Sequence, residues 1–543
     1  MKTIVGNWQT KERLLELLVS LVKIPSITGS KEEVQIANYL FENIKQLPYF
    51  EDHENHLQLH PTGEGRNFLT ALVKGKETSK KTIILVSHFD VVDIKDYGKC
   101  KDLAFDPKAL TERYIENKET LPESARKDIE QGNWLFGRGI MDMKAGLTLH
   151  MSMLEKACKG EFDGNILLVS VCDEEGNSTG MREAVPVMLQ MAEEFDLEYV
   201  ACLNSEPIFT QYPDDQNNYI YSGSVGKLNP GFLCYGKETH VGEPLSGINA
   251  NLMVSEITKE IELNPQFCES VLGEVTPPPT NLIQKGLKDE YSAKIPHNAV
   301  TLFNMFMMEK SVEEVNTEIE NAALRAAKRI EDTHLQRATE YSKLGGSTPK
   351  EVKVNVVFYE DLLNYAKATY GQDKIDEMIA NISADTTGKD ARDLSVQLID
   401  EIAHLCQEKW PMIVPFFAPP FYPAVNSGDN LLIRSVVDEI MDYAVKNYNI
   451  AMKEINYFPG VSDLSYTKLQ HPADSYKALI GNMPLWDNGY TIPFKDLEKL
   501  NVPSLNLGPI GRDAHKWTER LDIDYTFETL RDLMLVSIKR LLK

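Results

Sequence analysis

KTIILVSHFD (residues 81–90) contains a short apolar run rich in β-branched residues that leads directly into a histidine and an aspartate. NILLVSV (165–171) and EYVACL (198–203) are similar runs, and PSLNLG (503–508) is a further apolar run. Segments of helical character separate these runs. Such runs are typical of buried strands in a largely parallel sheet with helices on its faces. The sequence therefore predicts an α/β fold.

Side chains that can bind metal or carry protons follow these predicted strands: His88 and Asp90, then Glu174 and Glu175, then Glu206, and finally His515. In open α/β sheets, ligands bind at the carboxyl ends of the strands, because the loops there converge on one crevice. Asp142 of WLFGRGIMDMKAG (134–146) lies where a helix over 143–158 is expected to begin, and it can reach the same crevice. Each motif alone is more often a surface feature, but their coincidence at strand ends predicts a site.

The residue types at this predicted site suit a pair of metal ions. Imidazole and carboxylate are donors that Zn²⁺ accepts, and Mn²⁺ or Co²⁺ is the alternative. Two ions ~3.5–4 Å apart can share a bridging carboxylate and lower the pKa of a shared water. A further carboxylate must accept that water's proton and pass it to the leaving amine. Glu174 and Glu175 can divide these roles, because neighbouring side chains in extended backbone point in opposite directions. Asp90 is placed to orient His88.

Composition argues against several classes of function. The 543 residues include 57 basic and 81 acidic side chains, with a net charge of −24, so no nucleic-acid partner is expected. MKTIVGNWQTKERLLELL at the start contains no apolar stretch of signal-peptide type, and no apolar run reaches the length of a membrane span. The seven cysteines are dispersed without CxxC pairs, which predicts reduced thiols in a cytoplasmic protein.

The α/β texture is interrupted in the middle of the chain. Residues 311–343 predict a long amphipathic helix and residues 359–410 two or three more, before a helix over 429–447 restores the α/β character. We therefore expect a catalytic domain in two parts, 1–222 and 426–543, with an inserted domain over 223–425.

Local signals add detail near the start of the chain. Residues 9–24 predict a helix that Pro25 ends, and a second helix follows from Lys31, with Ser30 as N-cap and Glu33 at capping-box spacing. Residues 96–132 are charged and lack clear periodicity, so they are expected to form a surface excursion.

Taken in order, the motifs resemble the M20 family of dinuclear metallopeptidases and deacylases. They are SHFDVVD, GRGIMDMKAG, DEEGNSTGM, SEP, GVSDLSYT (460–467) and GPIGRDAHKWTE (508–519). The resemblance implies that one metal is bound by His88, Asp142 and Glu206, the other by Asp142, Glu175 and His515, and that Glu174 is the general acid/base. The stretch 221–250 resembles the entry into the family's lid domain, which implies that His240 helps to stabilise a tetrahedral oxyanion.

Two departures from the family pattern are informative. The predicted insertion is larger than the family's α+β lid and contains extra helices, and Phe306 stands where many members have an arginine that holds a substrate carboxylate. The length and the insertion resemble the arginine-utilisation, RocB-type branch of the family. That resemblance implies a small-molecule substrate, a dipeptide or N-acyl amino acid, near arginine or ornithine metabolism. The protein is then a homodimer, or a monomer whose enlarged lid supplies His240 within the chain.

Two other readings stay open at this point. The chain is either a hydrolase or an M20-like metal-binding regulatory protein that has lost turnover, although the intact Glu174 disfavours the second reading. A metal-dependent aminopeptidase outside this family is a third possibility.

Overall fold

In the computed structural model, the four apolar runs lie side by side in one eight-stranded sheet. The structure describes the chain except residues 1–5, 76–78, 213–214, 216, 289–291 and 386. The strand order is β1 (Leu57–Pro61), β2 (Asn67–Val73), β5 (Asn165–Val171), β3 (Lys81–His88), β6 (Glu198–Asn204), β18 (Ser504–Asn506), β7 (Asn218–Tyr221) and β17 (Met452–Ile455). Strands β5, β3, β6 and β18 run parallel, whereas β1 and β2 are antiparallel to their neighbours. The sheet is mixed, and its parallel centre brings four carboxyl ends to one edge.

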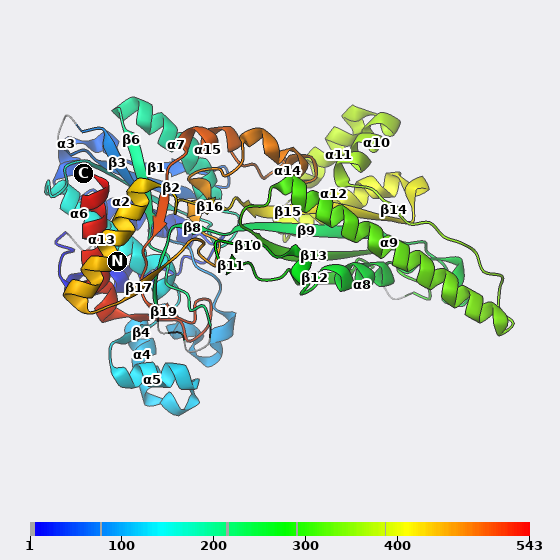
Figure 1. Cartoon of the computed structure of the whole chain (residues 1–543), viewed down its shortest axis with the longest axis horizontal. Coiled ribbons are helices and arrows are strands. Elements are labelled where there is room, and N and C mark those ends of the chain that lie inside the picture. Colours follow the sequence, from blue (N-terminus) through cyan, green and yellow to red (C-terminus); the bar gives the residue numbers. More distant parts are fainter. Residues whose placement is uncertain (1–5, 76–78, 213–214, 216, 289–291, 386) are drawn as a thin grey trace. The chain divides into compact units, whose positions relative to one another are not determined.

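Helices flank this sheet (Figure 1), as an α/β fold requires. They are α1 (Lys11–Val22), α2 (Glu32–Ile44), α6 (Ala145–Cys158), α7 (Thr179–Phe195), α13 (Leu431–Tyr448) and α16 (Arg531–Leu541). Helix α6 is buried along almost its whole length, because it packs against β3 and β5 on one side and against α1 on the other. Its apolar character all round the axis fits that central position.

The structure divides into two units. The first comprises Met1–Val225, Ala424–Gln470 and Pro493–Lys543, and the second comprises Gly226–Pro423 and His471–Ile492. The sequence placed residues 471–492 in the catalytic domain, which is wrong. The backbone amide of Phe417 donates to the carbonyl oxygen of Asn482 (2.8 Å), and that of Phe421 donates to the hydroxyl of Tyr490 (2.9 Å). These bonds tie the segment to the sheet of the second unit.

The second unit is built on a sheet of five strands. Their order is β12 (Thr280–Gly286), β13 (Asn298–Met307), β9 (Gly226–Tyr235), β15 (Met412–Tyr422) and β14 (Asn355–Val356). The helices of this unit include α8 (Ala250–Ile261), α9 (Val312–Lys343), α10 (Tyr359–Tyr370), α11 (Gln372–Ala384), α12 (Ala391–Leu405) and α14 (Lys477–Gly481). The long predicted helix is therefore α9, and three helices fill 359–410.

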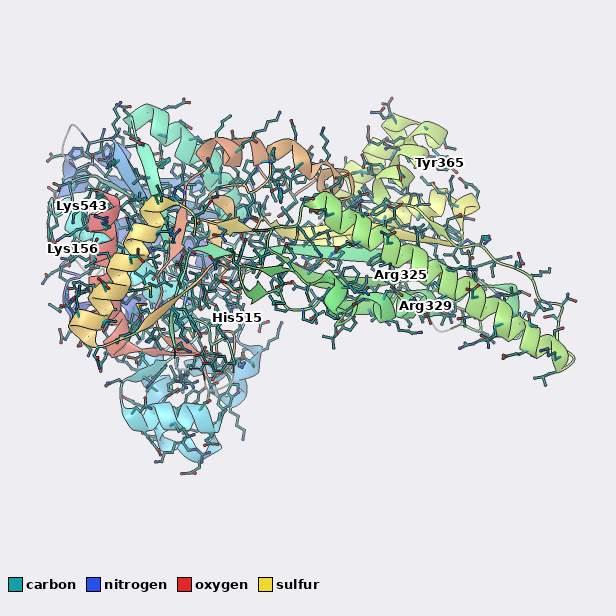
Figure 2. The ribbon with its side chains drawn as sticks, in the orientation of Figure 1. Lys156, Arg325, Arg329, Tyr365, His515 and Lys543 are labelled. Atoms are coloured by element: carbon teal, nitrogen blue, oxygen red, sulfur yellow. The ribbon has the colours of Figure 1, made fainter. Side chains whose placement is uncertain are left out.

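Local chemistry explains how α9 begins and where it packs. Ser311 and Glu314 form a reciprocal capping box at its start. Arg325 and Arg329, labelled in Figure 2, reach α8, where Nε of Arg329 lies 3.0 Å from Oε2 of Glu256.

One local expectation in the first unit needs correction. Ser30 is not an N-cap, because α2 begins at Glu32 without a side-chain cap. The carboxylate of Glu33 accepts from the amides of Gly29 and Asp173 (3.0 Å for Asp173) and from Arg66.

The stretch 96–132, predicted as a surface excursion, has regular structure. It contains a 3-10 segment (Lys95–Leu103), α4 (Pro107–Glu116) and α5 (Glu123–Gln131), which share a small apolar core with β4 (Trp134–Phe136).

Two chain-wide expectations concern membranes and disulfides. No helix in the described parts of the chain is long and apolar enough to span a membrane. All seven cysteines are free thiols.

Candidate metal centre

The parallel strands deliver polar side chains to one edge of the large sheet. β3 ends at His88, β5 leads into the turn with Glu174 and Glu175, and β6 leads into Glu206. His515 lies between the short strands β19 (Gly511–Arg512) and β20 (Arg520–Asp522).

Asp142 reaches this edge from the segment that precedes α6. Ile140–Lys144 forms a π-type turn, within which Asp142 has extended backbone (φ −116°, ψ 98°). Departure from helical geometry at this residue lets the carboxylate leave the helix and point at the strand ends.

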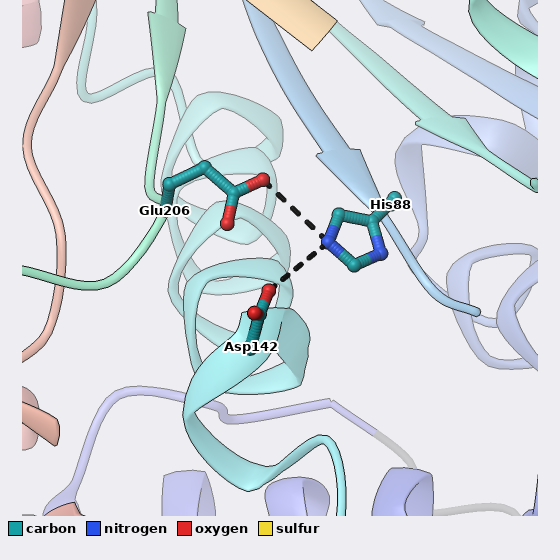
Figure 3. A group of neighbouring side chains, drawn as sticks. All are labelled: His88, Asp142 and Glu206. Atoms are coloured by element: carbon teal, nitrogen blue, oxygen red, sulfur yellow. Dashed lines mark hydrogen bonds and ion pairs between the residues drawn. The ribbon is translucent and has the colours of Figure 1, made fainter. Parts of the chain in front are cut away.

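His88, Asp142 and Glu206 form the first ligand group (Figure 3). Nε2 of His88 lies 3.3 Å from Oδ1 of Asp142 and 3.5 Å from Oε1 of Glu206. All three side chains are buried. Their candidate ligand atoms lie within 4.8 Å of one another, a separation that one metal ion can span.

Asp142, Glu175 and His515 form the second ligand group. Nε2 of His515 lies 2.8 Å from Oε1 of Glu175 and 3.1 Å from Oδ2 of Asp142. Asp142 therefore presents Oδ1 to one imidazole and Oδ2 to the other. Candidate ligand atoms of His88, Glu174 and Glu175 also lie within 4.8 Å of one another.

The donor set fits cations. Burying several carboxylates together is costly unless positive charge neutralises them. Burial and the nearby charge of Asp142 raise the pKa of Glu175. Burial also raises the pKa of Glu206 well above its ordinary range, although the imidazole of His88 opposes the shift. Oε1 of Glu206 is buried without a hydrogen-bond partner in the described parts of the chain. Metal ions would satisfy that oxygen and the excess of negative charge.

Glu174 has the properties of a proton carrier. It is buried, and its Oε2 lies 3.9 Å from Nε2 of His88. Burial, helped by the charge of Glu175, raises the pKa of Glu174 well above the ordinary value for a carboxyl. A carboxyl with a raised pKa can both take up and release a proton near neutral pH.

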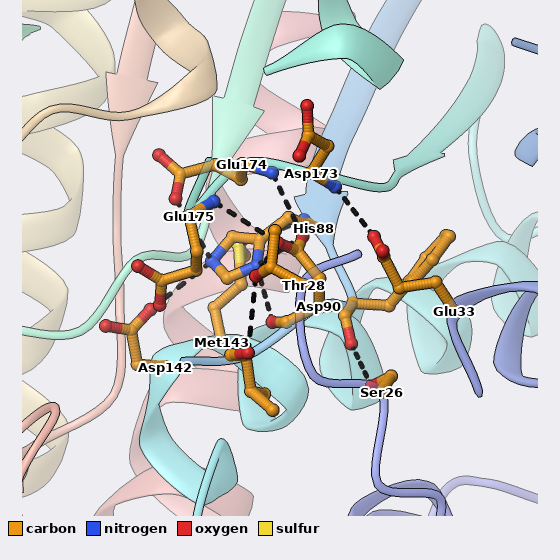
Figure 4. A network of polar contacts seen from close by, with 12 residues as sticks. Ser26, Thr28, Glu33, His88, Asp90, Asp142, Met143, Asp173, Glu174 and Glu175 are labelled. Atoms are coloured by element: carbon orange, nitrogen blue, oxygen red, sulfur yellow. Dashed lines mark hydrogen bonds and ion pairs between the residues drawn. The ribbon is translucent and has the colours of Figure 1, made fainter. Parts of the chain in front are cut away.

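Asp90 holds the turn that carries both glutamates (Figure 4). Its Oδ1 accepts from the backbone amide of Glu174 (3.0 Å), and its Oδ2 accepts from that of Glu175 (3.2 Å) and from the hydroxyl of Thr28 (2.8 Å). Nδ1 of His88 lies 3.1 Å from the carbonyl oxygen of Asp90 and 3.5 Å from its carboxylate. Asp90 thus orients His88 mainly through its backbone, and its carboxylate serves the turn.

Sequence reasoning missed a second support of this turn. Oδ2 of Asp173 accepts from the amide and the hydroxyl of Thr179. Nη1 of Arg66 lies 2.7 Å from Oδ1 of Asp173 and 3.2 Å from Glu33. Arg66 lies in a loop without sequence periodicity, so nothing in the local sequence indicates that it supports this turn.

Asp463 is another residue with no predicted role. It is 1% exposed, and neither of its carboxylate oxygens has a hydrogen-bond partner among the residues that the structure describes. Burial raises its pKa to about 7, and its charge contributes to the raised pKa of Glu174 and Glu206. The only available signal was its place in the segment GVSDLSYT.

His240 belongs to the second unit, whereas the residues described above belong to the first. It is exposed, and its backbone forms an isolated bridge with Lys294. Its Nδ1 accepts from the amide of Gly242 (3.1 Å).

Comparison with known proteins decides the family, since residues 84–531 match the model of "Peptidase family M20/M25/M40". The chain belongs to this family. This M20 protein is 50% identical over 538 residues to the uncharacterized protein YqjN of Bacillus subtilis (strain 168), covering 99% of this chain and 98% of the relative. It is 30% identical to protein RocB of the same organism, covering 100% of this chain and 97% of RocB.

Similarity extends to other relatives at lower identity. A succinyl-diaminopimelate desuccinylase of Legionella pneumophila (strain Corby) is 23% identical over 248 residues, which cover 45% of this chain and 56% of that enzyme. A tripeptidase structure from Staphylococcus aureus matches the fold with a TM-score of 0.53 at 14% identity, covering 99% of this chain and 100% of that one. The predicted M20 membership, hydrolase class and α/β fold are confirmed, and the alternative of an aminopeptidase outside the family is excluded.

Proposed function

We propose that this M20 protein hydrolyses the amide bond of a dipeptide or an N-acyl amino acid with the help of two divalent metal ions. The first ligand group would hold one ion and the second ligand group the other. The observation that carries this proposal is the position of Asp142, whose two oxygens face two different imidazoles, those of His88 and His515.

The residues divide the chemistry between them. When bound, two such ions lower the pKa of a water molecule and polarise the carbonyl that it attacks. Glu174 accepts the proton of the attacking water and passes it to the leaving amine, for which its raised pKa suits it. Asp90 keeps Glu174 and Glu175 at fixed positions through their backbone amides. By resemblance to the family, His240 would stabilise the oxyanion.

The proposal also covers the identity of the metal, the class of substrate and the cellular compartment. Zn²⁺ is the expected metal, because both ligand groups combine imidazole with carboxylate. The resemblance to the arginine-utilisation branch of the family suggests a substrate related to arginine. Phe306, half-buried on β13, offers no charge to a substrate carboxylate, so we expect that group to contribute little to recognition. The seven free cysteines support a cytoplasmic setting.

Hydrolysis and metal content, measured together, test the proposal. The purified full-length chain would be assayed on N-acyl amino acids, dipeptides and arginine derivatives, each with a free and an amidated carboxylate. We expect turnover, two metal ions per chain, and a loss of kcat of about 10²–10⁴-fold in Glu174→Gln with unchanged metal content. Full metal loading without turnover on any amide would instead support the regulatory metal-binding alternative.

A further inference from the structure

The helical excursion, defined here as residues 95–131, packs against the segments that carry Asp142 and His515. Strand β4, directly after the excursion, pairs with β20, and β20 pairs with β19. The loop between β19 and β20 carries His515. Figure 1 shows α4 and α5 beside β4 in the first unit. Three sets of contacts join the excursion to the metal centre.

The first set begins at Asp128 on α5. Its Oδ2 accepts from Nε of Arg520 at 2.7 Å, and both side chains are buried. Nη1 of Arg520 also donates to Oδ2 of Asp513, which accepts from the hydroxyl of Thr518 as well (2.8 Å). One carboxylate of the excursion therefore fixes the arginine that closes the base of the loop around His515.

The second set begins at Tyr114 on α4. Its hydroxyl donates to the carbonyl oxygen of Trp517 (2.8 Å), two residues after His515. The two rings also meet edge to face at 5.7 Å.

The third set joins the two metal-binding segments to each other. Arg138 is buried, and its Nη1 lies 2.8 Å from Oε2 of Glu519 while its Nη2 lies 3.0 Å from Oδ1 of Asp96 in the excursion. Oε1 of Glu519 accepts from the amide of Met141 (3.3 Å), the residue before Asp142.

The loop that carries His515 contains two residues with left-handed backbone. His515 and Asp513 have φ of 64° and 60°. Asp and His adopt this uncommon conformation more readily than most residues other than glycine, and contacts around the loop help to hold it. Asp513 has such contacts through Arg520 and Thr518, and those contacts lead back to α5.

We propose that the helical excursion is a positioning element for the second ligand group, acting through Asp128 and Tyr114 on the loop of His515. This inference rests on the proposed two-metal function. Asp128 and Tyr114 contact the segment around His515, which belongs to the second ligand group alone. Asp142, which both groups share, is reached through Arg138 and Glu519 instead. Loss of the contacts made by Asp128 or Tyr114 therefore weakens binding of the second metal and leaves the first unchanged.

Titration of the metal-free, full-length chain with Co²⁺ tests the inference. Two variants disturb the contacts: Asp128→Asn removes the charge that holds Arg520, and Tyr114→Phe removes only a hydroxyl. Each has a matched control. Glu130→Gln is the control for Asp128→Asn. Glu130 lies on the same helix as Asp128, and its exposed carboxylate pairs with Lys118. Tyr97→Phe removes a hydroxyl of the same apolar core that has no hydrogen-bond partner within the described residues.

Wild type and both controls should bind two ions per chain with the same two affinities. Asp128→Asn should weaken one site about 10–100-fold and leave the other unchanged, as replacement of partners that orient metal ligands usually does. Tyr114→Phe should weaken the same site by a smaller factor. If Asp128→Asn does not fold, the affinities of Tyr114→Phe alone test the inference.

Two results would overturn the inference. In the first, Tyr114→Phe and Asp128→Asn bind both Co²⁺ ions with the affinities of the wild type. In the second, the variants weaken both metal sites equally. Either result leaves the proposed function intact. A wild-type chain that binds fewer than two ions contradicts the proposed function itself.

Discussion

Asp90 shows how one side chain can place several others. Its two carboxylate oxygens accept from the amides of Glu174 and Glu175, and they also accept from the hydroxyl of Thr28. A carboxylate is an acceptor only, whereas an amide of the same shape presents an NH₂ group on one side. The charge and the two acceptor oxygens of Asp90 therefore affect the positions of both the proposed general base, Glu174, and the proposed metal ligand, Glu175.

Asp90→Asn is expected to lower kcat about 10–100-fold with a smaller effect on KM, because the turn bearing Glu174 loses one of its acceptors. Steady-state kinetics and metal analysis on the same preparations check this. Thr28→Val is the control, since it removes a hydroxyl donor and keeps both backbone bonds, and it should cost much less. Equal losses in the two variants would contradict the role given to the Asp90 carboxylate.

Among the elements, β18 and the two residues after it lie close to the end of β6, and they hold the candidate metal ligand Glu206 in position. A Cβ atom added to Gly508 would lie 1.6 Å from the carbonyl oxygen of Glu206. Nδ2 of Asn506 donates to that same oxygen (3.0 Å), and Oδ1 of Asn506 accepts from the amide of Glu206 (2.8 Å). The backbone of Glu206 is thus held by Asn506 at the end of β18 and approached closely by Gly508, two residues later.

Gly508→Ala is expected to displace Glu206 and weaken the first metal, and to cost about 1–3 kcal/mol of stability, as overpacking usually does. Metal titration and urea unfolding measure the two effects. Gly63→Ala is the matched control, because its nearest neighbour would be Oε1 of Glu183 at 3.8 Å. Normal affinity for both metals in Gly508→Ala would show that Glu206 is not held in this way.

For the whole molecule, the two units differ in which candidate site residues they contain. All five candidate metal ligands lie in the first unit, whereas His240 lies in the second. A ligand that binds only the folded state stabilises it by about 2.7 kcal/mol when present at 100 times its Kd. Metal should therefore stabilise one unit directly.

Chelation is expected to lower protection from hydrogen exchange in β3, β5 and β6, and to leave α9 and β13 of the second unit unchanged. Mass spectrometry of peptides from both units, with and without chelator, measures this. A control exposure to chelator followed by Zn²⁺ should restore protection. Equal loss of protection in both units would contradict the confinement of metal binding to the first.

Several features were predictable from the sequence because their signals are local. The apolar runs that became β3, β5, β6 and β18 are short, those of β3 and β5 are rich in β-branched residues, and the side chains after the runs follow from strand direction alone. Helix α9 was predicted from its amphipathic period, and the structure adds the capping box at Ser311. The candidate ligands were found for the same reason.

Other features depend on partners far away in the chain. Serine is a residue type that favours N-caps, yet α2 has no side-chain cap from Ser30, and the carboxylate of Glu33 contacts Arg66 and the amide of Asp173 from distant segments. Residues 471–492 belong with β15 through hydrogen bonds that no periodicity reveals.

Hydrophobic period and chain direction were enough to predict the four apolar strands, the long helix and the edge of the sheet at which the candidate ligands meet. Packing between distant segments sets the position of Asp142 beside two imidazoles, the burial of Asp463 without a hydrogen-bond partner among the described residues, and the contact of the excursion with the loop of His515. Those outcomes depend on distances between segments hundreds of residues apart, which packing sets and local sequence does not encode.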